Sequence, residues 1–241
     1  MTVNVVVTGK LPKDPVIIEA FPSRGYVSTI AANHMIKQLG MELVGYVECD
    51  KLDAVAVVHE SKPMHPIRIY AKDNLVVIFS ELIIPLNLVH EFTSAIGEWF
   101  NSMKPKKAIL LASVPGVESK HKHEILTVTM DEEMRGALKK ANVREMDEGV
   151  LTGMSSSLMM KCVNMNLPVT SLMVETTYVP DVSAAASLMR ILSELLDLKV
   201  DTDELAKAGK DIEEKFRDNL EKLKIGQENY KEMHQQSTMY R

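Results

Sequence analysis

The run Leu75-Val76-Val77-Ile78-Phe79 is apolar at every position, and a second such run, Ala108-Ile109-Leu110-Leu111, follows further along the chain. A strand that is apolar on both faces has to be covered on both sides, and in α/β proteins helices do this. Two amphipathic stretches of helical length, Val27–Leu39 and Leu86–Met103, flank these runs. The sequence therefore predicts an α/β three-layer sandwich, with a mixed, mostly parallel sheet covered by helices.

Short β-branched segments alternate with helical ones through most of the chain. Two further helices are predicted at Ser155–Met165 and Val182–Leu198, the second with Asp181 or Ser183 as its N-cap. The turn sequence Asp73-Asn74 predicts a β-hairpin. The predicted strands are Val3–Thr8, Val16–Glu19, Leu43–Glu48, Ala54–His59, Ile67–Tyr70, Leu75–Ser80, Ala108–Ala112, Glu124–Thr129 and Val169–Glu175.

Composition sets limits on the function. With 241 residues, 46% of them hydrophobic and 25% charged, the chain can bury a full core. Its net charge of -5 opposes binding to nucleic acid. Cys49 and Cys162 have no CxxC spacing, which gives no basis for a disulfide or zinc framework. No apolar run reaches the roughly 18 residues of a membrane span. We expect a cytoplasmic protein without nucleic-acid or membrane partners.

The chain changes character after Leu198. From there a single apolar stripe recurs every 3.5 residues on average, the spacing of a coiled-coil seam. Such a stripe needs a partner, which is either the body of the same protomer or the same helix of a neighbour. We expect a core domain over residues 1–200 and a helical arm with a polar tail over residues 201–241. The stripe consists of Leu205, Ala208, Ile212, Phe216, Leu220, Leu223, Gly226, Tyr230 and Met233.

The chain ends in Met239-Tyr240-Arg241. A penultimate tyrosine next to a free α-carboxylate offers a partner apolar area, a phenolic hydroxyl and a negative charge. This ending is interpreted as a group that binds in a pocket of another protein.

Several stretches together resemble the proteasome-assembly-chaperone family. Gly25-Tyr26-Val27 resembles the family's glycine-then-helix opening, and the order and spacing of the later stretches support the resemblance over residues 14–200. The later stretches are Asp147-Glu148-Gly149-Val150-Leu151-Thr152-Gly153, Leu167-Pro168-Val169, Glu175-Thr176-Thr177-Tyr178-Val179-Pro180-Asp181 and Ala184-Ala185-Ala186.

The resemblance, which is closest to the archaeal members, implies a function at the proteasome. In similar proteins a terminal hydrophobic-Tyr-any tripeptide inserts between neighbouring α-subunits of the core particle, and its carboxylate meets a lysine. Carried over, Met239 supplies apolar contact, Tyr240 the ring and hydroxyl, and Arg241 the carboxylate. No stretch matches the P-loop pattern, so this role requires no ATP and no other cofactor. Several arms on one homo-oligomer, such as a tetramer, would raise the affinity.

The sequence also contains candidate residues for two other kinds of site. His121, His123 and Glu118 lack a dependable further metal ligand, so no metal site is expected. Ser155, near a helix start, is expected to act as a cap.

The alternative function is a protein that binds a small molecule, or an enzyme, which acts on a phosphate or nucleoside at the strand ends, where α/β sheets often have such sites. Its candidate residues are His59, Arg68, Gly153, Ser155 and Glu175. No nucleophile, base and orienting group can be assembled from them, so a non-enzymatic protein is expected.

Overall fold

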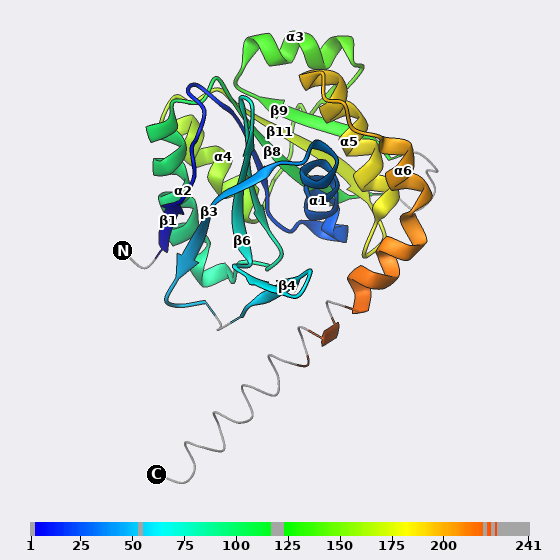
Figure 1. The fold of residues 1–241 in the computed structure, drawn as a ribbon. Helices are drawn as coiled ribbons and strands as arrows, with labels where there is room; N and C mark the ends of the chain where they lie inside the picture. The colour runs from blue at the N-terminus through cyan, green and yellow to red at the C-terminus, as the bar shows by residue number, and fades with distance from the viewer. Residues whose placement is uncertain (1–2, 53–54, 117–122, 219–220, 223–224, 226–241) are drawn as a thin grey trace.

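The computed structural model describes residues 3–52, 55–116, 123–218, 221–222 and 225 (Figure 1). Nine of the described strands form one sheet in the order β1-β3-β6-β7-β2-β8-β11-β9-β10, and β4 and β5 form a separate hairpin. The strands are β1 (Val3–Val7), β2 (Val16–Ala20), β3 (Glu42–Cys49), β4 (Val57–His59), β5 (Lys62–Met64), β6 (Ile67–Lys72), β7 (Leu75–Ser80), β8 (Lys107–Pro115), β9 (Ile125–Thr129), β10 (Arg144–Glu145) and β11 (Val169–Thr176).

Helices lie on both faces of the sheet (Figure 1). One core contains side chains of α1 and α5, and the other contains side chains of α2 and α4. Alternate side chains of the central strands point into opposite cores. On β2, Ile18 lies in the first core and Ile17 lies in the second. The predicted three-layer sandwich is confirmed. The helices are α1 (Val27–Leu39), α2 (Val89–Met103), α3 (Glu132–Lys140), α4 (Met154–Asn164), α5 (Val182–Leu196) and α6 (Thr202–Lys207), with 3-10 turns at Arg24–Tyr26 and Leu86–Leu88.

Strand direction differs in one respect from the expectation. The sheet is mixed as predicted, but parallel pairs do not predominate, because the described strands make four parallel and four antiparallel pairings. The parallel pairs join β7, β2, β8 and β11 in the centre. The hairpin turn Asp73-Asn74 makes β6 antiparallel to β7, as predicted, and β3 and β1 continue that antiparallel edge.

The N-cap of α5 was predicted correctly from the sequence, and the N-cap of α4 was not. Asp181 is the N-cap of α5, since its side chain accepts a hydrogen bond from the Ala184 backbone N–H at 2.8 Å. The expectation that Ser155 is the N-cap of α4 is wrong. Gly153 occupies the N-cap position of α4 without a side-chain cap, and Ser155 lies inside the first turn with its hydroxyl directed at Glu19.

The start of the arm lies on its own protomer. Helix α6 contacts α5, and residues 209–218 continue as helix after Ala208. Leu205 is buried in the first core, and Ile212 and Phe216 are half-buried against it. This part of the apolar stripe therefore uses the body as its partner. The stripe residues Leu220, Leu223, Gly226, Tyr230 and Met233 lie outside the residues whose side chains the structure describes.

Candidate functional site

Two of the stretches that carried the family resemblance meet in space. Gly25 lies within the 3-10 turn Arg24–Tyr26 before α1, and its carbonyl oxygen accepts a hydrogen bond from the Asp181 backbone N–H at 3.0 Å. Gly25 has φ of +70°, and a Cβ built on it would lie 2.9 Å from the Tyr178 carbonyl oxygen and 3.0 Å from the Thr176 hydroxyl. Only glycine fits this turn without displacement. The Gly25 turn and the Thr176–Asp181 loop are thus held against each other.

A buried hydrogen bond fixes the loop side of this junction. The Thr176 hydroxyl donates to the Asp181 carboxylate at 2.5 Å, and both residues are almost fully buried. The same carboxylate caps α5. In the same loop, Tyr178 and Val179 are 67% and 54% exposed. The junction therefore holds two apolar side chains out toward solvent.

The arm is anchored at this junction. The Tyr26 and Phe216 rings lie 4.9 Å apart at 58°, and the Val182 backbone N–H donates to the Glu213 carboxylate at 3.4 Å. At the start of α6, the Asp201 side chain accepts a hydrogen bond from the Glu204 backbone N–H. The His34 ring donates a hydrogen bond to the Asp201 carbonyl oxygen at 2.8 Å. The arm accordingly leaves the body from a defined point.

The predicted proteasome-binding residues Met239, Tyr240 and Arg241 lie outside the described residues. The structure describes the first part of the arm, through residue 218. The contacts of this part with the body were not identified from the sequence, although the apolar positions Ile212 and Phe216 were part of the predicted stripe.

Of the residues proposed for the alternative function, His59 and Arg68 do come together. Both pair with Glu81: His59 Nε2 lies 2.8 Å from a Glu81 carboxylate oxygen, and the Arg68 guanidinium contacts the same oxygen. Arg68 is buried and also donates to the His65 carbonyl oxygen at 2.9 Å. This cluster neutralises its own charge, which leaves an ion-pair arrangement rather than an open anion site.

Ser155 belongs to a different cluster. Its hydroxyl donates to Glu19 at 3.2 Å, and the Phe21 backbone N–H donates to the same carboxyl oxygen at 3.0 Å. Glu19 is fully buried, and burial raises its pKa to about 8. Cys162 is also buried here, and burial with the Glu19 charge raises the pKa of its thiol to about 12, so this thiol is not activated as a nucleophile. Sequence reasoning missed Glu19, although a single acid in Val16-Ile17-Ile18-Glu19-Ala20 was a visible signal.

The remaining candidates do not complete a catalytic group. Gly153 is exposed, and the Glu175 backbone oxygen accepts a hydrogen bond from His123 Nδ1 at 2.9 Å. Among the described residues, no hydrogen bond or ion pair joins the Glu19 cluster to the Glu81 cluster. The described part of the chain also contains no group of three His, Cys, Asp or Glu side chains suited to a metal. His121 and Glu118 lie outside that part.

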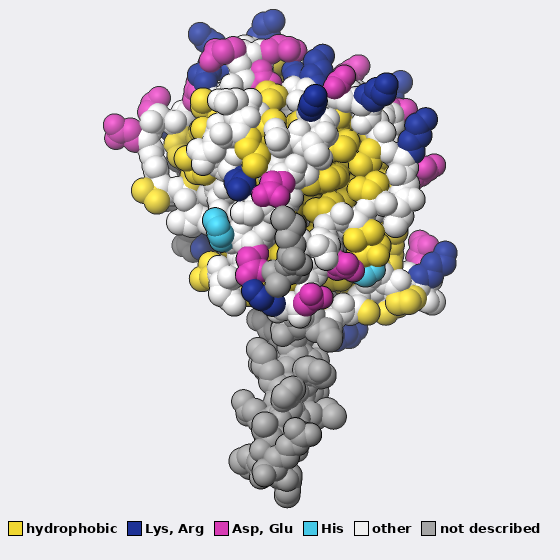
Figure 2. Space-filling model, turned by 90° about the vertical axis from the view of Figure 1, so that its left-hand side faces the viewer, with side chains coloured by type: hydrophobic (Ala, Val, Ile, Leu, Met, Phe, Trp, Pro, Cys, Tyr) yellow, Lys and Arg dark blue, Asp and Glu magenta, His cyan; other side chains and the backbone are white. Residues whose placement is uncertain are grey.

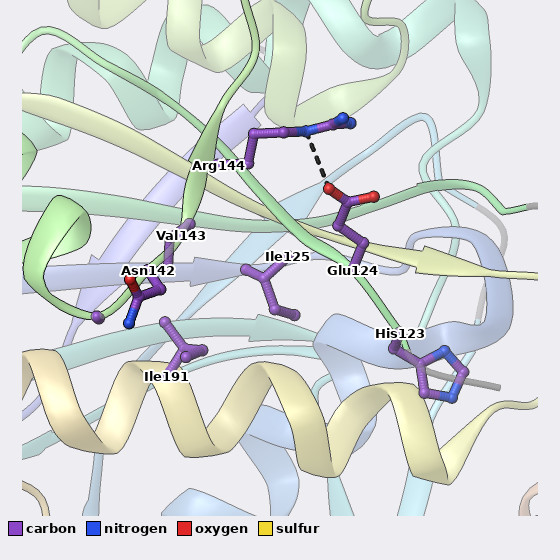
Figure 3. A pocket seen from close by; sticks show the side chains of 8 residues that line it. His123, Glu124, Ile125, Asn142, Val143, Arg144 and Ile191 are labelled. Atoms are coloured by element: carbon purple, nitrogen blue, oxygen red, sulfur yellow. Dashed lines mark ion pairs between the residues drawn. The ribbon is translucent and has the colours of Figure 1, made fainter. Parts of the chain in front are cut away.

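A groove lies between α5 and the edge of the sheet (Figure 3). Its volume is about 520 Å³. Ile125 and Val143 come from the sheet side, and Ile191 faces them from α5. His123 and Asn142 also line the groove, whereas Arg144, whose Nε pairs with Glu124 at 3.0 Å, lies with that glutamate on the other side of the strands from Ile191 (Figure 3). The side chains that face one another across the groove, Ile125, Val143 and Ile191, are therefore apolar.

Another part of the surface carries a group of exposed hydrophobic side chains. On the side of the molecule where β1 and β3 lie, Figure 2 shows hydrophobic side chains gathered over a broad area. Val7 at the end of β1 is 40% exposed, and Leu43 on β3 is 47% exposed. Exposed apolar areas of this kind are typical of protein–protein contacts.

In the described ranges, no helix has the length and apolar character needed to cross a membrane.

The chain is similar to members of a known protein family. The sequence model of the PAC2 family matches residues 17–219. An uncharacterised protein of Methanocaldococcus jannaschii is 30% identical over 222 residues, which cover 91% of this chain and 92% of that protein. The matched range includes the turn at Gly25 and the part of the arm that contains Phe216.

Two solved structures share the fold. The crystal structure of Pyrococcus furiosus PbaA, described as an archaeal homolog of proteasome-assembly chaperone, is 30% identical with a TM-score of 0.85, over 93% of this chain and 99% of that one. Pyrococcus furiosus PbaB, described as an archaeal proteasome activator, has a TM-score of 0.73 over 90% of this chain and 99% of that one. At 19% identity the similarity to PbaB shows the fold alone.

Proposed function

The chain belongs to the PAC2 family, and we propose that it is an ATP-independent proteasome assembly chaperone or activator. In this proposal the C-terminal residues Met239, Tyr240 and Arg241 bind in pockets between α-subunits of the proteasome core particle. The observation that carries the proposal is the 30% identity to PbaA over nearly the whole of both chains, together with the terminal tripeptide.

The chemistry of the tripeptide supports this role. A tyrosine ring is a frequent anchor in protein interfaces, and a carboxylate that meets a lysine forms a charge-assisted hydrogen bond. The Arg241 side chain is the variable position. The anchoring of the arm at Tyr26 and Phe216 supports a division into a core of residues 1–200 and an arm of residues 201–241. The body then acts as the carrier of the arm.

We further propose that the protein is a cytoplasmic homo-oligomer, such as a tetramer, without enzymatic activity. A three-residue contact is small, and several arms that bind together raise the apparent affinity by roughly 10²- to 10⁴-fold. The exposed apolar side chains on the β1 and β3 side, Val7 and Leu43, support self-association.

The proposal is tested by capture of purified core particle on the immobilised full chain. Deletion of Met239–Arg241 should abolish capture, and Tyr240→Ala should be nearly as damaging, because the ring and hydroxyl are lost. Arg241→Ala is the matched control: it keeps the carboxylate at the same position and should bind normally. Equal capture by the full chain and the deletion variant would remove the assigned role of the tripeptide.

A further inference from the structure

A serine and a histidine meet at one end of the groove between α5 and β9. The Ser183 hydroxyl, exposed in the first turn of α5, lies 3.0 Å from His123 Nε2. His123 Nδ1 lies 2.9 Å from the Glu175 carbonyl oxygen on β11. Because a carbonyl oxygen only accepts hydrogen bonds, Nδ1 carries the ring hydrogen of the neutral imidazole. The lone pair is therefore on Nε2, and the Ser183 hydroxyl donates to it.

This arrangement contains a nucleophile, a base and an orienting group. A serine hydroxyl that donates to an imidazole nitrogen can pass its proton to that nitrogen as it attacks an electrophile. The Glu175 carbonyl holds the ring in the required tautomer. The Asp181 carboxylate lies 3.7 Å from Nε2 and stabilises the imidazolium that forms. Ser183 is therefore a better nucleophile than a surface serine without such a neighbour.

The backbone around Ser183 limits the electrophiles that can react. Acyl transfer to serine is fast when free N–H groups stabilise the oxyanion. Here the Val182 N–H donates to the Glu213 carboxylate at 3.4 Å, and the Ala184 N–H donates to the Asp181 carboxylate at 2.8 Å. Because these two donors are occupied, the reaction needs an acyl donor with a good leaving group, such as a thioester. For the same reason, the oxygen ester that results is hydrolysed slowly.

The groove provides room for a transferred acyl group. Ser183, Ser187 and Ile191 are four residues apart, so they follow one stripe of α5. Ile191 faces Ile125 and Val143 across the groove (Figure 3). From Ser183 to Ile191 the helix rises about 12 Å. An acyl chain of medium length on Ser183 therefore reaches these apolar side chains.

We propose that Ser183 is a site of covalent acylation, at which Oγ takes an acyl group from an acyl thioester, His123 acts as the general base, and the groove holds the acyl chain. Oγ forms a bond to the thioester carbonyl carbon, and its proton moves to His123 Nε2. The carbon–sulfur bond breaks, and the leaving thiolate takes that proton to become a thiol. One acyl group is added per chain without turnover. The modification goes beyond the proposed function and does not depend on it.

The test exposes the purified full chain to S-octanoyl-N-acetylcysteamine and measures its intact mass. Treatment with dithiothreitol before the measurement removes acyl groups from Cys49 and Cys162, because thioesters exchange with thiols and oxygen esters do not. The mass should increase by one octanoyl group, which peptide fragmentation should locate on Ser183. Ser183→Ala should lose the added mass. Ser187→Ala is the matched control, because it removes a hydroxyl one turn further along α5 and should be labelled like the parent.

The base and the groove are tested by rate. His123→Asn retains an amide donor for the Glu175 carbonyl but removes the base, and labelling should slow by roughly 10²-fold. On the parent protein, octanoyl transfer should be roughly tenfold or more faster than acetyl transfer from the matching acetyl thioester, because only the longer chain reaches the apolar side chains. Ile191→Ala should slow octanoyl transfer several-fold and leave acetyl transfer unchanged.

Three results would overturn the site. These are the absence of octanoyl from Ser183, equal labelling rates in the parent and His123→Asn, and equal rates for the octanoyl and acetyl donors. The donor comparison uses the parent protein alone, so it does not depend on the folding of any variant. Capture of core particle is a separate measurement, and its failure would remove the proposed function while leaving the acylation site in place.

Discussion

The ring of Tyr26, at the start of α1, packs against the ring of Phe216, in the arm, with 4.9 Å between the ring centroids. These residues are 190 positions apart in the chain. Burial raises the pKa of the Tyr26 hydroxyl, so this ring is neutral at physiological pH and contributes an apolar contact. The contact joins a turn of the body to the last described turns of the arm, and it defines where the arm departs.

Removing this ring contact should loosen the arm without unfolding the body. Phe216→Ala is expected to cost about 1 to 2 kcal/mol locally, from lost apolar area and the aromatic pair. Hydrogen exchange of residues 209–218 should accelerate, while the central strands β2 and β8 remain protected. Phe216→Leu retains most of the apolar area and serves as the control. Unchanged exchange in Phe216→Ala would show that the ring does not hold the arm.

The turn at Gly25 should not tolerate a side chain. Gly25→Ala combines a left-handed φ with a Cβ placed 2.9 Å from the Tyr178 carbonyl oxygen, and we expect a loss of about 2 to 4 kcal/mol in unfolding free energy. Gly40→Ala is the matched control, with φ of +59° and no atom within 4 Å of the added Cβ. Its loss should be about 1 kcal/mol. Denaturant titration measures both, and equal losses would contradict the close contact at Gly25.

The buried Glu19 carboxyl should make stability depend on pH. Its folded pKa is about 8 against an ordinary value of 4.5, so the folded state retains a proton that the unfolded state releases. The contribution of this group is full below pH 4.5 and is lost as pH rises toward 8. Glu19→Gln mimics the protonated form and should be more stable than the parent at pH 8, by on the order of 2 to 4 kcal/mol.

The comparison needs both pH values, because other groups also titrate. The stability difference between Glu19→Gln and the parent should be near zero at pH 4.5 and grow toward pH 8. Thermal or denaturant unfolding across this range provides the measurement. A difference that stays constant with pH would mean that Glu19 is ionised in the folded protein at neutral pH.

The Arg68–Glu81 pair should be strongly structural. Arg68 is buried, and removing its partner in Glu81→Ala leaves a guanidinium in the interior without its carboxylate, at a cost of about 3 kcal/mol. Glu133→Ala breaks the Lys107–Glu133 pair, in which Glu133 is 72% exposed, and should leave unfolding unchanged. Urea midpoints of the two variants check the contrast, and equal midpoints would refute it.

The sequence was sufficient for those features that depend on neighbouring residues. The predicted helix over Val27–Leu39 and the strand over Leu75–Ser80 match the structure residue for residue, because their apolar spacing repeats within one short window. The hairpin at Asp73-Asn74 and the Asp181 cap also depend on local geometry alone. Helix α3 was not predicted, since only Met134 and Leu138 of its residues are buried and charged side chains dominate.

Only the tertiary structure decided which distant groups meet. Strand order, and with it the equal share of parallel and antiparallel pairs, depends on how segments far apart in the chain dock. The same is true of the contact between Gly25 and Asp181, the charge state of Glu19 and the position of the arm on α5. The physical reason is that periodicity fixes which face of an element is apolar, whereas burial by distant residues determines the partner of that face and the pKa of any acid enclosed there.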